Sequence, residues 1–379
     1  MPRRCLLRVP IVAVVFIGAA LAVGSGQEGA FRTPWGEPDL QGLWNSETIT
    51  PLERPARWAD KPVLTAEEAA AVEKWVASTP GRDDRSMRGT ERDVAGAYNE
   101  LWSPPRDVGL SDRRTGLVID PPDGRIPPLT PEAQKRTREV RDYLRALLEG
   151  TASGPAGSKP SPRRGEPPPA YNVDRMNRSD GPEDRSTMER CFGIGMPVYE
   201  RAIYRIVQSP GQVGMYIDFG QGQGFQRTIP VDGSRHLPST IRLLHGDSRG
   251  RWDGDALVVS VANFTNRTDF RGAREHLRLT ERLTRVSRDR IMYRVTVEDP
   301  ATWTRPWTLE IAWNREPDRP NRSYESTCHE GNYGLLGMLA NTRAAEALHA
   351  TGQGPDPATQ DNATGGGTGA ERSVANFPR

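Results

Sequence analysis

Residues 277–297 read LRLTERLTRVSRDRIMYRVTV. Apolar and polar residues alternate over 277–286 and again over 291–297, which is typical of strands that bury one face. The polar residues 287–290 between them suit the turn of a hairpin. This stretch therefore predicts two neighbouring antiparallel strands that share one face of an apolar core.

The same alternation continues on both sides of this hairpin. No helical pattern of useful length interrupts residues 200–310, which argues against a parallel sheet with crossover helices. We therefore predict a mainly β fold, either an antiparallel β-barrel or a sandwich. The glycine-rich segment 220–224 is interpreted as a hairpin loop, because a strand and not a helix follows it. Further strands are expected at 201–208, 212–219, 226–231, 256–264, 307–313 and 323–329, with a turn at 251–255.

The chain before these strands is rich in Trp, Pro and Gly, and we interpret it as an extended N-terminal arm with peripheral helices. Thr65 and Glu68 occupy the reciprocal positions of a capping box at the start of one helix. Pro131 follows Thr130 at the first position of a second helix. The predicted parts are a signal peptide (1–26), an arm with two helices that packs on the barrel (27–150), a Pro/Gly-rich linker (151–185), the β domain with a C-terminal helix (186–350) and a disordered tail (351–379).

The first 26 residues have the order of a secretory signal. Arg3, Arg4 and Arg8 precede an uncharged apolar run of about fifteen residues, and small residues follow. A retained anchor is the alternative, but the run is shorter than the roughly twenty residues that span a bilayer. We expect cleavage after Ala22 or Gly26, a periplasmic or secreted protein, and no membrane span thereafter.

The cysteines support an oxidising compartment. Of the three in the chain, Cys5 lies in the signal, and Cys191 and Cys328 remain as a candidate disulfide. The alternative is a nucleophilic Cys328 beside His329. The net charge of +2 and the absence of a basic patch interleaved with aromatic residues give no reason to expect nucleic acid as a partner.

Two charged residues interrupt apolar rows of the predicted strands. Glu281 shares a face with Leu279 and Leu283, and Arg205 shares a face with Ile203. A charge on a core face is costly unless it is paired. Glu281 and Arg205 either bond each other or nearby backbone inside the barrel, or they line a ligand cavity. A shift of strand register by one residue would instead place them in water.

The first functional hypothesis is that the barrel binds a small apolar or aromatic molecule, since small barrels hold one ligand in the cup. Arg205, Glu281, Tyr293 and Trp307 are the candidate ligand-binding residues. The tryptophans late in the chain form either a stacking wall for such a ligand or part of the core. We predict no cofactor and no metal, since the sequence has no closely spaced histidine pair. The alternative is a metal site built from histidines that are distant in sequence.

The second hypothesis is a cofactor-independent hydrolase, lyase or isomerase that works by acid–base chemistry. Its candidate catalytic residues are His245, Asp247, His329 and Glu330, which we place in two polar loops. A serine-hydrolase triad is not predicted, because Ser239 and Ser248 do not lie in a Gly-x-Ser-x-Gly elbow. A third hypothesis is an envelope protein that binds a partner through exposed tryptophans.

Five segments of the sequence carry a resemblance to known proteins: TPWGEPDLQGLW (33–44), GDSRGRW (246–252), EDP (298–300), TRPW (304–307) and CHEGNY (328–333). Together they resemble a family of secreted bacterial proteins that is numerous in acidobacteria and related soil or marine bacteria. The resemblance implies an extracytoplasmic location and carries no mechanism. The hairpin of 281–285 and 293–296 is also similar to strands of calycin-like barrels of the lipocalin type, which implies a cup for a small apolar ligand.

Overall fold

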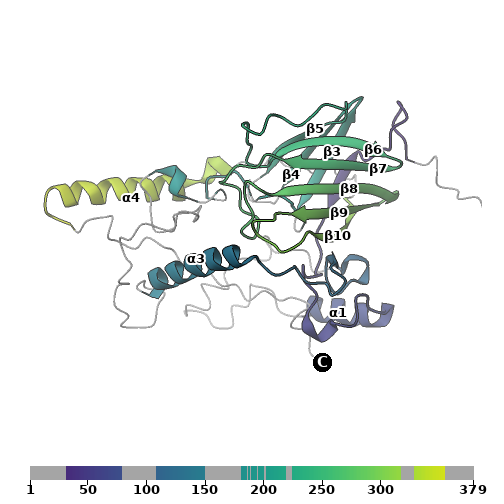
Figure 1. Ribbon diagram of the computed structural model, residues 1–379, viewed down its shortest axis with the longest axis horizontal. Coiled ribbons are helices and arrows are strands. Elements are labelled where there is room, and N and C mark those ends of the chain that lie inside the picture. Colours follow the sequence, from purple (N-terminus) through teal and green to yellow (C-terminus); the bar gives the residue numbers. More distant parts are fainter. Residues whose placement is uncertain are drawn as a thin grey trace, which may run out of the picture.

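The structure is a computed structural model that describes residues 31–78, 108–149, 181–185, 187, 189–193, 195–199, 202–218, 224–316 and 328–354. Its centre is a ten-stranded antiparallel sheet that is nearly closed into a barrel (Figure 1). The prediction of a mainly β, antiparallel barrel with few helices is confirmed. The predicted signal peptide and the predictions for residues 151–180, 220–223, 323–327 and 355–379 lie outside the described residues.

The sheet combines strands from the whole described chain. Its order is β5-β4-β3-β1-β10-β9-β8-β7-β6, and β2 pairs with β10. The N-terminal arm therefore contributes β1 between β3 and β10, in addition to packing against the barrel. The strands are β1 (Gly42–Asn45), β2 (Val118–Asp120), β3 (Ile203–Ser209), β4 (Gln212–Asp218), β5 (Phe225–Pro230), β6 (Asp247–Asp253), β7 (Ala256–Ala262), β8 (Arg278–Ser287), β9 (Arg290–Glu298) and β10 (Trp307–Arg315).

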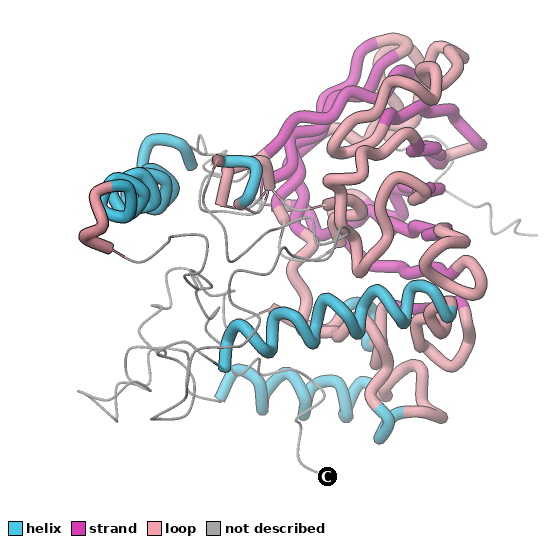
Figure 2. Tube along the Cα trace, turned by 60° about the vertical axis from the view of Figure 1, so that its left-hand side comes forward, coloured by secondary structure: helices cyan, strands magenta, loops and turns pink. Residues whose placement is uncertain are grey.

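The helices lie outside the sheet (Figure 2). The capping box is present: Glu68 Oε2 accepts from the Thr65 backbone N–H at 2.9 Å, and Thr65 Oγ1 accepts from the Glu68 N–H at 3.2 Å. Among the described residues, no helix has the length and apolar character needed to cross a membrane. The helices are α1 (Ala66–Ser78), α3 (Pro131–Glu149), α4 (Tyr333–Ala350) and the short 3-10 helices η1 (Ala56–Trp58), η3 (Ser111–Arg113), η4 (Pro182–Asp184) and η5 (Cys328–Gly331).

One prediction is wrong at strand β6. The sequence pattern indicates a loop at the first residues of this strand and a turn at its last ones. Its inward positions carry few apolar residues, so the usual alternation is hidden. Gly250 explains how it packs: a Cβ there would lie 2.9 Å from Ile229 Cγ2 of β5. The glycine lets β5 and β6 approach across the seam that nearly closes the barrel.

A second correction concerns the end of the predicted β domain. Residues 328–331 form η5, where the sequence predicts the last residues of a strand at 323–329. The predicted disulfide is confirmed, since Cys191 and Cys328 are bonded with their Cα atoms 5.6 Å apart. The alternative of a nucleophilic Cys328 is wrong, because its sulfur is part of this bond.

A third correction concerns the register of β3. Tyr204 and Ile206 are buried, whereas Val207 is 56% exposed. Arg205 therefore lies on the outer face and not among the core side chains. Both faces of β3 carry branched apolar residues, so the alternation alone could not show which face is buried.

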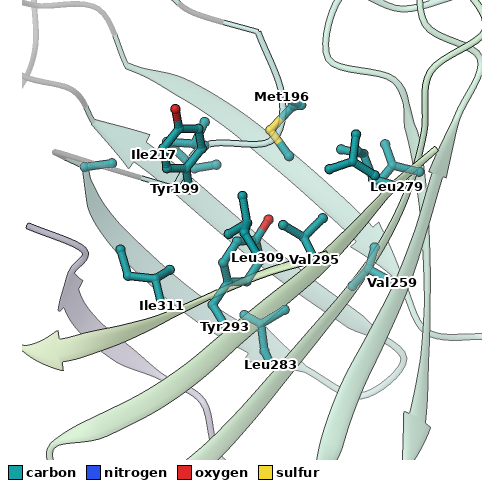
Figure 3. Close-up of a cluster of buried hydrophobic side chains, with 14 of the residues drawn as sticks. Met196, Tyr199, Ile217, Val259, Leu279, Leu283, Tyr293, Val295, Leu309 and Ile311 are labelled. Atoms are coloured by element: carbon teal, nitrogen blue, oxygen red, sulfur yellow. The ribbon is translucent and has the colours of Figure 1, made fainter. Parts of the chain in front are cut away.

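A short segment, residues 195–199, contributes Met196, Val198 and Tyr199 to the main core and is called the plug below. Met196 and Val198 are almost fully buried in the main core. In Figure 3 Met196 and Tyr199 lie opposite side chains that the strands send inward, among them Tyr293. The disulfide at Cys191 ties the chain just before the plug to η5.

Candidate functional site

The barrel interior contains a buried polar cluster, defined by Arg227, Ser248, Glu281 and Tyr293. Four different strands supply these residues: β5, β6, β8 and β9. The exposed fractions are 7% for Arg227 and 1% for Glu281. An ionised pair is thus held almost wholly out of water within an otherwise apolar core.

The hydrogen bonds of the polar cluster converge on the Glu281 carboxylate. Arg227 Nη1 donates to Glu281 Oε1 at 3.0 Å, and Arg227 Nη2 donates to Oε2. Tyr293 Oη donates to Oε1 at 2.7 Å. Arg227 Nε donates to Ser248 Oγ at 2.8 Å, across the seam between β5 and β6. The bidentate arrangement fixes the guanidinium plane relative to the carboxylate.

Burial and charge shift the ionisation of these groups. Burial by itself lowers the pKa of Arg227. The charge and hydrogen bonds of Glu281 together outweigh this effect, so the pKa of Arg227 is above its ordinary value. Burial, and then the negative charge of Glu281, raise the pKa of Tyr293 well above its usual range. The arginine is therefore charged and the phenol neutral at any physiological pH.

A small cavity of about 10 Å³ adjoins the polar cluster, which is room for about one water molecule. The plug contributes Met196 and Val198 to its lining. Aromatic rings form part of its wall: Tyr204 stacks on Trp313 with ring centroids 3.8 Å apart, and Tyr293 lies 4.7 Å from the same ring. The lining residues are Met196, Val198, Tyr204, Met215, Ile217, Arg227, Glu281, Leu283, Tyr293 and Trp313.

Two of the four candidate ligand-binding residues meet at this cavity, namely Glu281 and Tyr293. Arg205 does not, and the guanidinium that pairs with Glu281 belongs to Arg227. Sequence reasoning missed Arg227, although it shares the inward face of β5 with Ile229. This is the same signal, a charge in an apolar row, that identified Glu281.

Trp307 lies elsewhere in the core. It is fully buried, and its ring centroid lies 6.1 Å from that of Phe270 and 5.6 Å from that of Trp303. Of the two interpretations of the late tryptophans, core packing therefore applies to Trp307.

The candidate catalytic residues lie in different elements. His245 stacks on Phe225 with centroids 3.7 Å apart. Asp247 begins β6 and is engaged by His236. His329 and Glu330 lie in η5, where both are exposed. Asp247, which was expected in a loop, is thus the first residue of a strand. Its carboxylate contacts His236, which was not among the candidate catalytic residues.

Within the described residues, no group of three or more His, Cys, Asp or Glu side chains could hold a metal ion. No protein-family model and no curated protein matches this chain. The function must therefore be argued from the geometry of the chain itself.

Proposed function

We propose that this protein is a periplasmic or secreted barrel that binds one small neutral molecule with an apolar or aromatic body. The observation that carries the proposal is the polar cluster beside the cavity in an apolar barrel. The extracytoplasmic location is supported by the signal-like residues 1–26 and by the disulfide, which is typical of oxidising compartments.

The polar cluster is energetically less favourable than apolar side chains would be at the same positions in the barrel. Replacing a buried ion pair with apolar residues of similar volume is often neutral or stabilising by about 1–4 kcal/mol. Packing alone therefore does not explain why Arg227 and Glu281 lie here. A role in recognising a polar group of a ligand does explain it.

The donors of Arg227 indicate what that polar group is. A guanidinium has five N–H donors, and the hydrogen bonds to Glu281 and Ser248 use three of them. The remaining donors suit an acceptor such as a carbonyl or phenolic oxygen. A carboxylate ligand would compete with Glu281 for the same guanidinium, so a neutral group fits better.

The body of the ligand is expected to be flat and apolar. Trp313 and Tyr204 provide stacked aromatic faces, and Leu283 and Met215 provide aliphatic contacts at the same cavity. Aromatic ligands gain from offset or edge contacts with such rings in addition to the area they bury.

Because the cavity holds only about one water, a ligand must displace the plug. The plug is attached by apolar contacts and by a hydrogen bond of 3.1 Å from Tyr204 Oη to the Val198 carbonyl. Exposing Met196 and Val198 costs roughly 1.5–3 kcal/mol each. A ligand that buries comparable apolar area in their place offsets this cost.

The test uses prodan, a neutral naphthalene ketone whose fluorescence shifts to the blue in apolar sites. We expect saturable binding at one site, with competition by neutral 2-acetonaphthone at least tenfold stronger than by 2-naphthoate. The double variant R227M/E281L should lose the binding while staying folded. Arg205→Met is the matched control, because it removes an arginine from the outer face of the barrel.

Absence of a saturable blue shift with the full chain contradicts the proposal. So does a double variant that binds prodan as tightly as the unmodified protein, since the probe would then lie away from the polar cluster.

A further inference from the structure

A second polar constellation lies on the outer face of the barrel. Asp247 Oδ2 is 2.7 Å from His236 Nδ1, and His236 Nε2 is 2.9 Å from Ser260 Oγ. With the proton on Nδ1, the imidazole donates to the carboxylate and accepts from the serine hydroxyl. This is the order of groups that converts a serine into a nucleophile.

The carboxylate of Asp247 is held in place from several sides. The backbone N–H of Leu237 donates to Oδ2 at 3.0 Å, and Arg249 Nη1 lies 3.0 Å from Oδ1. The Asp247 side chain is 5% exposed, whereas that of His236 is 29% exposed. A buried, oriented carboxylate thus faces one side of a ring whose other side is open to solvent.

The loop that carries His236 is pinned on both sides of the histidine. Arg249 Nε donates to the Arg235 carbonyl at 2.7 Å, and Asn263 Nδ2 donates to the Leu237 carbonyl at 2.8 Å. These bonds hold the imidazole against the sheet. Positioning of the base by the fold is what a catalytic arrangement requires.

Strand geometry places Ser260 on the same face. Its neighbours Val259 and Val261 are fully buried, so the serine side chain points outward and is exposed. In the sheet Ser260 pairs with Arg249 of β6 and with Thr280 of β8. The proposed nucleophile therefore stands on a strand that is paired on both sides, and precise sites need such a rigid element.

We propose that Ser260, activated by His236 and Asp247, is an acyl-accepting nucleophile that hydrolyses small activated carboxylic esters. The Ser260 oxygen bonds to the ester carbonyl carbon, and its proton passes to His236 Nε2. The bond to the alcohol oxygen then breaks, and His236 returns the proton to that oxygen. Water repeats the sequence on the acyl-serine and releases the acid, so ester and water become acid and alcohol.

The surroundings limit the substrate to activated esters. Ser260 lies in β7, between β6 and β8, so the sheet uses its backbone hydrogen-bonding groups. Side chains must then stabilise the developing oxyanion, and the neighbouring strand carries one hydroxyl side chain opposite Ser260, that of Thr280. Loss of one well-placed oxyanion donor costs about 10²–10³ in rate. A good leaving group, as in a phenyl ester, compensates for this.

The test is covalent labelling of the full chain with a fluorophosphonate, followed by peptide mass spectrometry. We expect the adduct on Ser260 to form at least a hundredfold faster than on Ser239, an exposed serine of the loop that carries His236. Ser260→Ala should abolish this adduct and most p-nitrophenyl acetate hydrolysis. Asp247→Asn should slow both, and Ser239→Ala should change neither.

The labelling experiment uses the unmodified protein, so its result does not depend on whether a variant folds. Equal labelling of Ser260 and Ser239 would overturn it. Hydrolysis of p-nitrophenyl acetate by the Ser260→Ala variant at the rate of the unmodified protein would also overturn it. Neither result bears on ligand binding inside the barrel.

Discussion

The polar cluster makes a quantitative prediction about coupling between Arg227 and Glu281. We consider the variants Arg227→Met and Glu281→Leu singly and together. Each single change leaves an uncompensated charge that is at least nine-tenths buried, for which the cost is about 3–5 kcal/mol. Two independent losses of that size would together cost about 6–10 kcal/mol.

The double variant should not show this sum. It removes both charges, and what remains are the hydroxyls of Ser248 and Tyr293 without their former partners. A buried polar group left unsatisfied costs about 1–3 kcal/mol. Two such groups would cost about 2–6 kcal/mol, and removal of the buried ion pair offsets part of this cost. We therefore expect the double variant to lose about 2–4 kcal/mol, and the coupling free energy to be at least about 2 kcal/mol.

The measurement is urea unfolding at pH 7, followed by tryptophan fluorescence with the disulfide intact. Trp44, Trp307 and Trp313 are fully buried, so their emission reports loss of the core. Arg205→Met serves as the control for loss of an outer-face arginine. Single effects that add within about 0.5 kcal/mol would refute the reasoning, because independent sites behave in that way.

Three further predictions concern stability. Burial raises the pKa values of Tyr204 and Tyr293, so the stability that these phenols contribute is complete below the unfolded tyrosine pKa of about 10 and is lost as the pH rises beyond it. In urea unfolding at increasing alkaline pH, Tyr293→Phe should lose less stability than the unmodified protein. An equal loss in the two proteins would count against the buried phenol. The disulfide closes a separation of 137 residues, so replacing both cysteines with serine should cost about 5 kcal/mol in the chain-entropy model, and a loss below about 1 kcal/mol would contradict it. Gly250→Val should destabilise by about 1–3 kcal/mol through overpacking against Ile229. Gly337→Val in α4, where an added Cβ meets nothing within 4 Å and φ is not positive, should change stability by less than about 1 kcal/mol. Calorimetric melting compares the two variants, and equal shifts would count against a tight seam.

Alternation of residue type predicted much of this fold. The hairpin at 277–297 is found as β8 and β9 and sends Glu281 and Tyr293 inward as expected. The signal failed where both faces of a strand are apolar, as at Arg205, because a period of two does not reveal which face is buried. It also failed at β6, where Gly250 replaces the usual apolar residue at a close approach.

The partners across the barrel could not be predicted from the sequence. Arg227 and Glu281 meet because β5 and β8 face each other in a nearly closed sheet, and that closure depends on contacts between strands far apart in the chain. For the same reason, a loop, the start of β6 and the middle of β7 bring His236, Asp247 and Ser260 together. No short motif connects those three positions.

A crystal structure of the protein grown with 2-acetonaphthone would decide whether a ligand binds inside the barrel. We predict the ring against Trp313, the ketone oxygen within hydrogen-bonding distance of Arg227, and Met196 moved out of the core. An unchanged plug, with the ketone bound only on the outer surface, would contradict the proposed function.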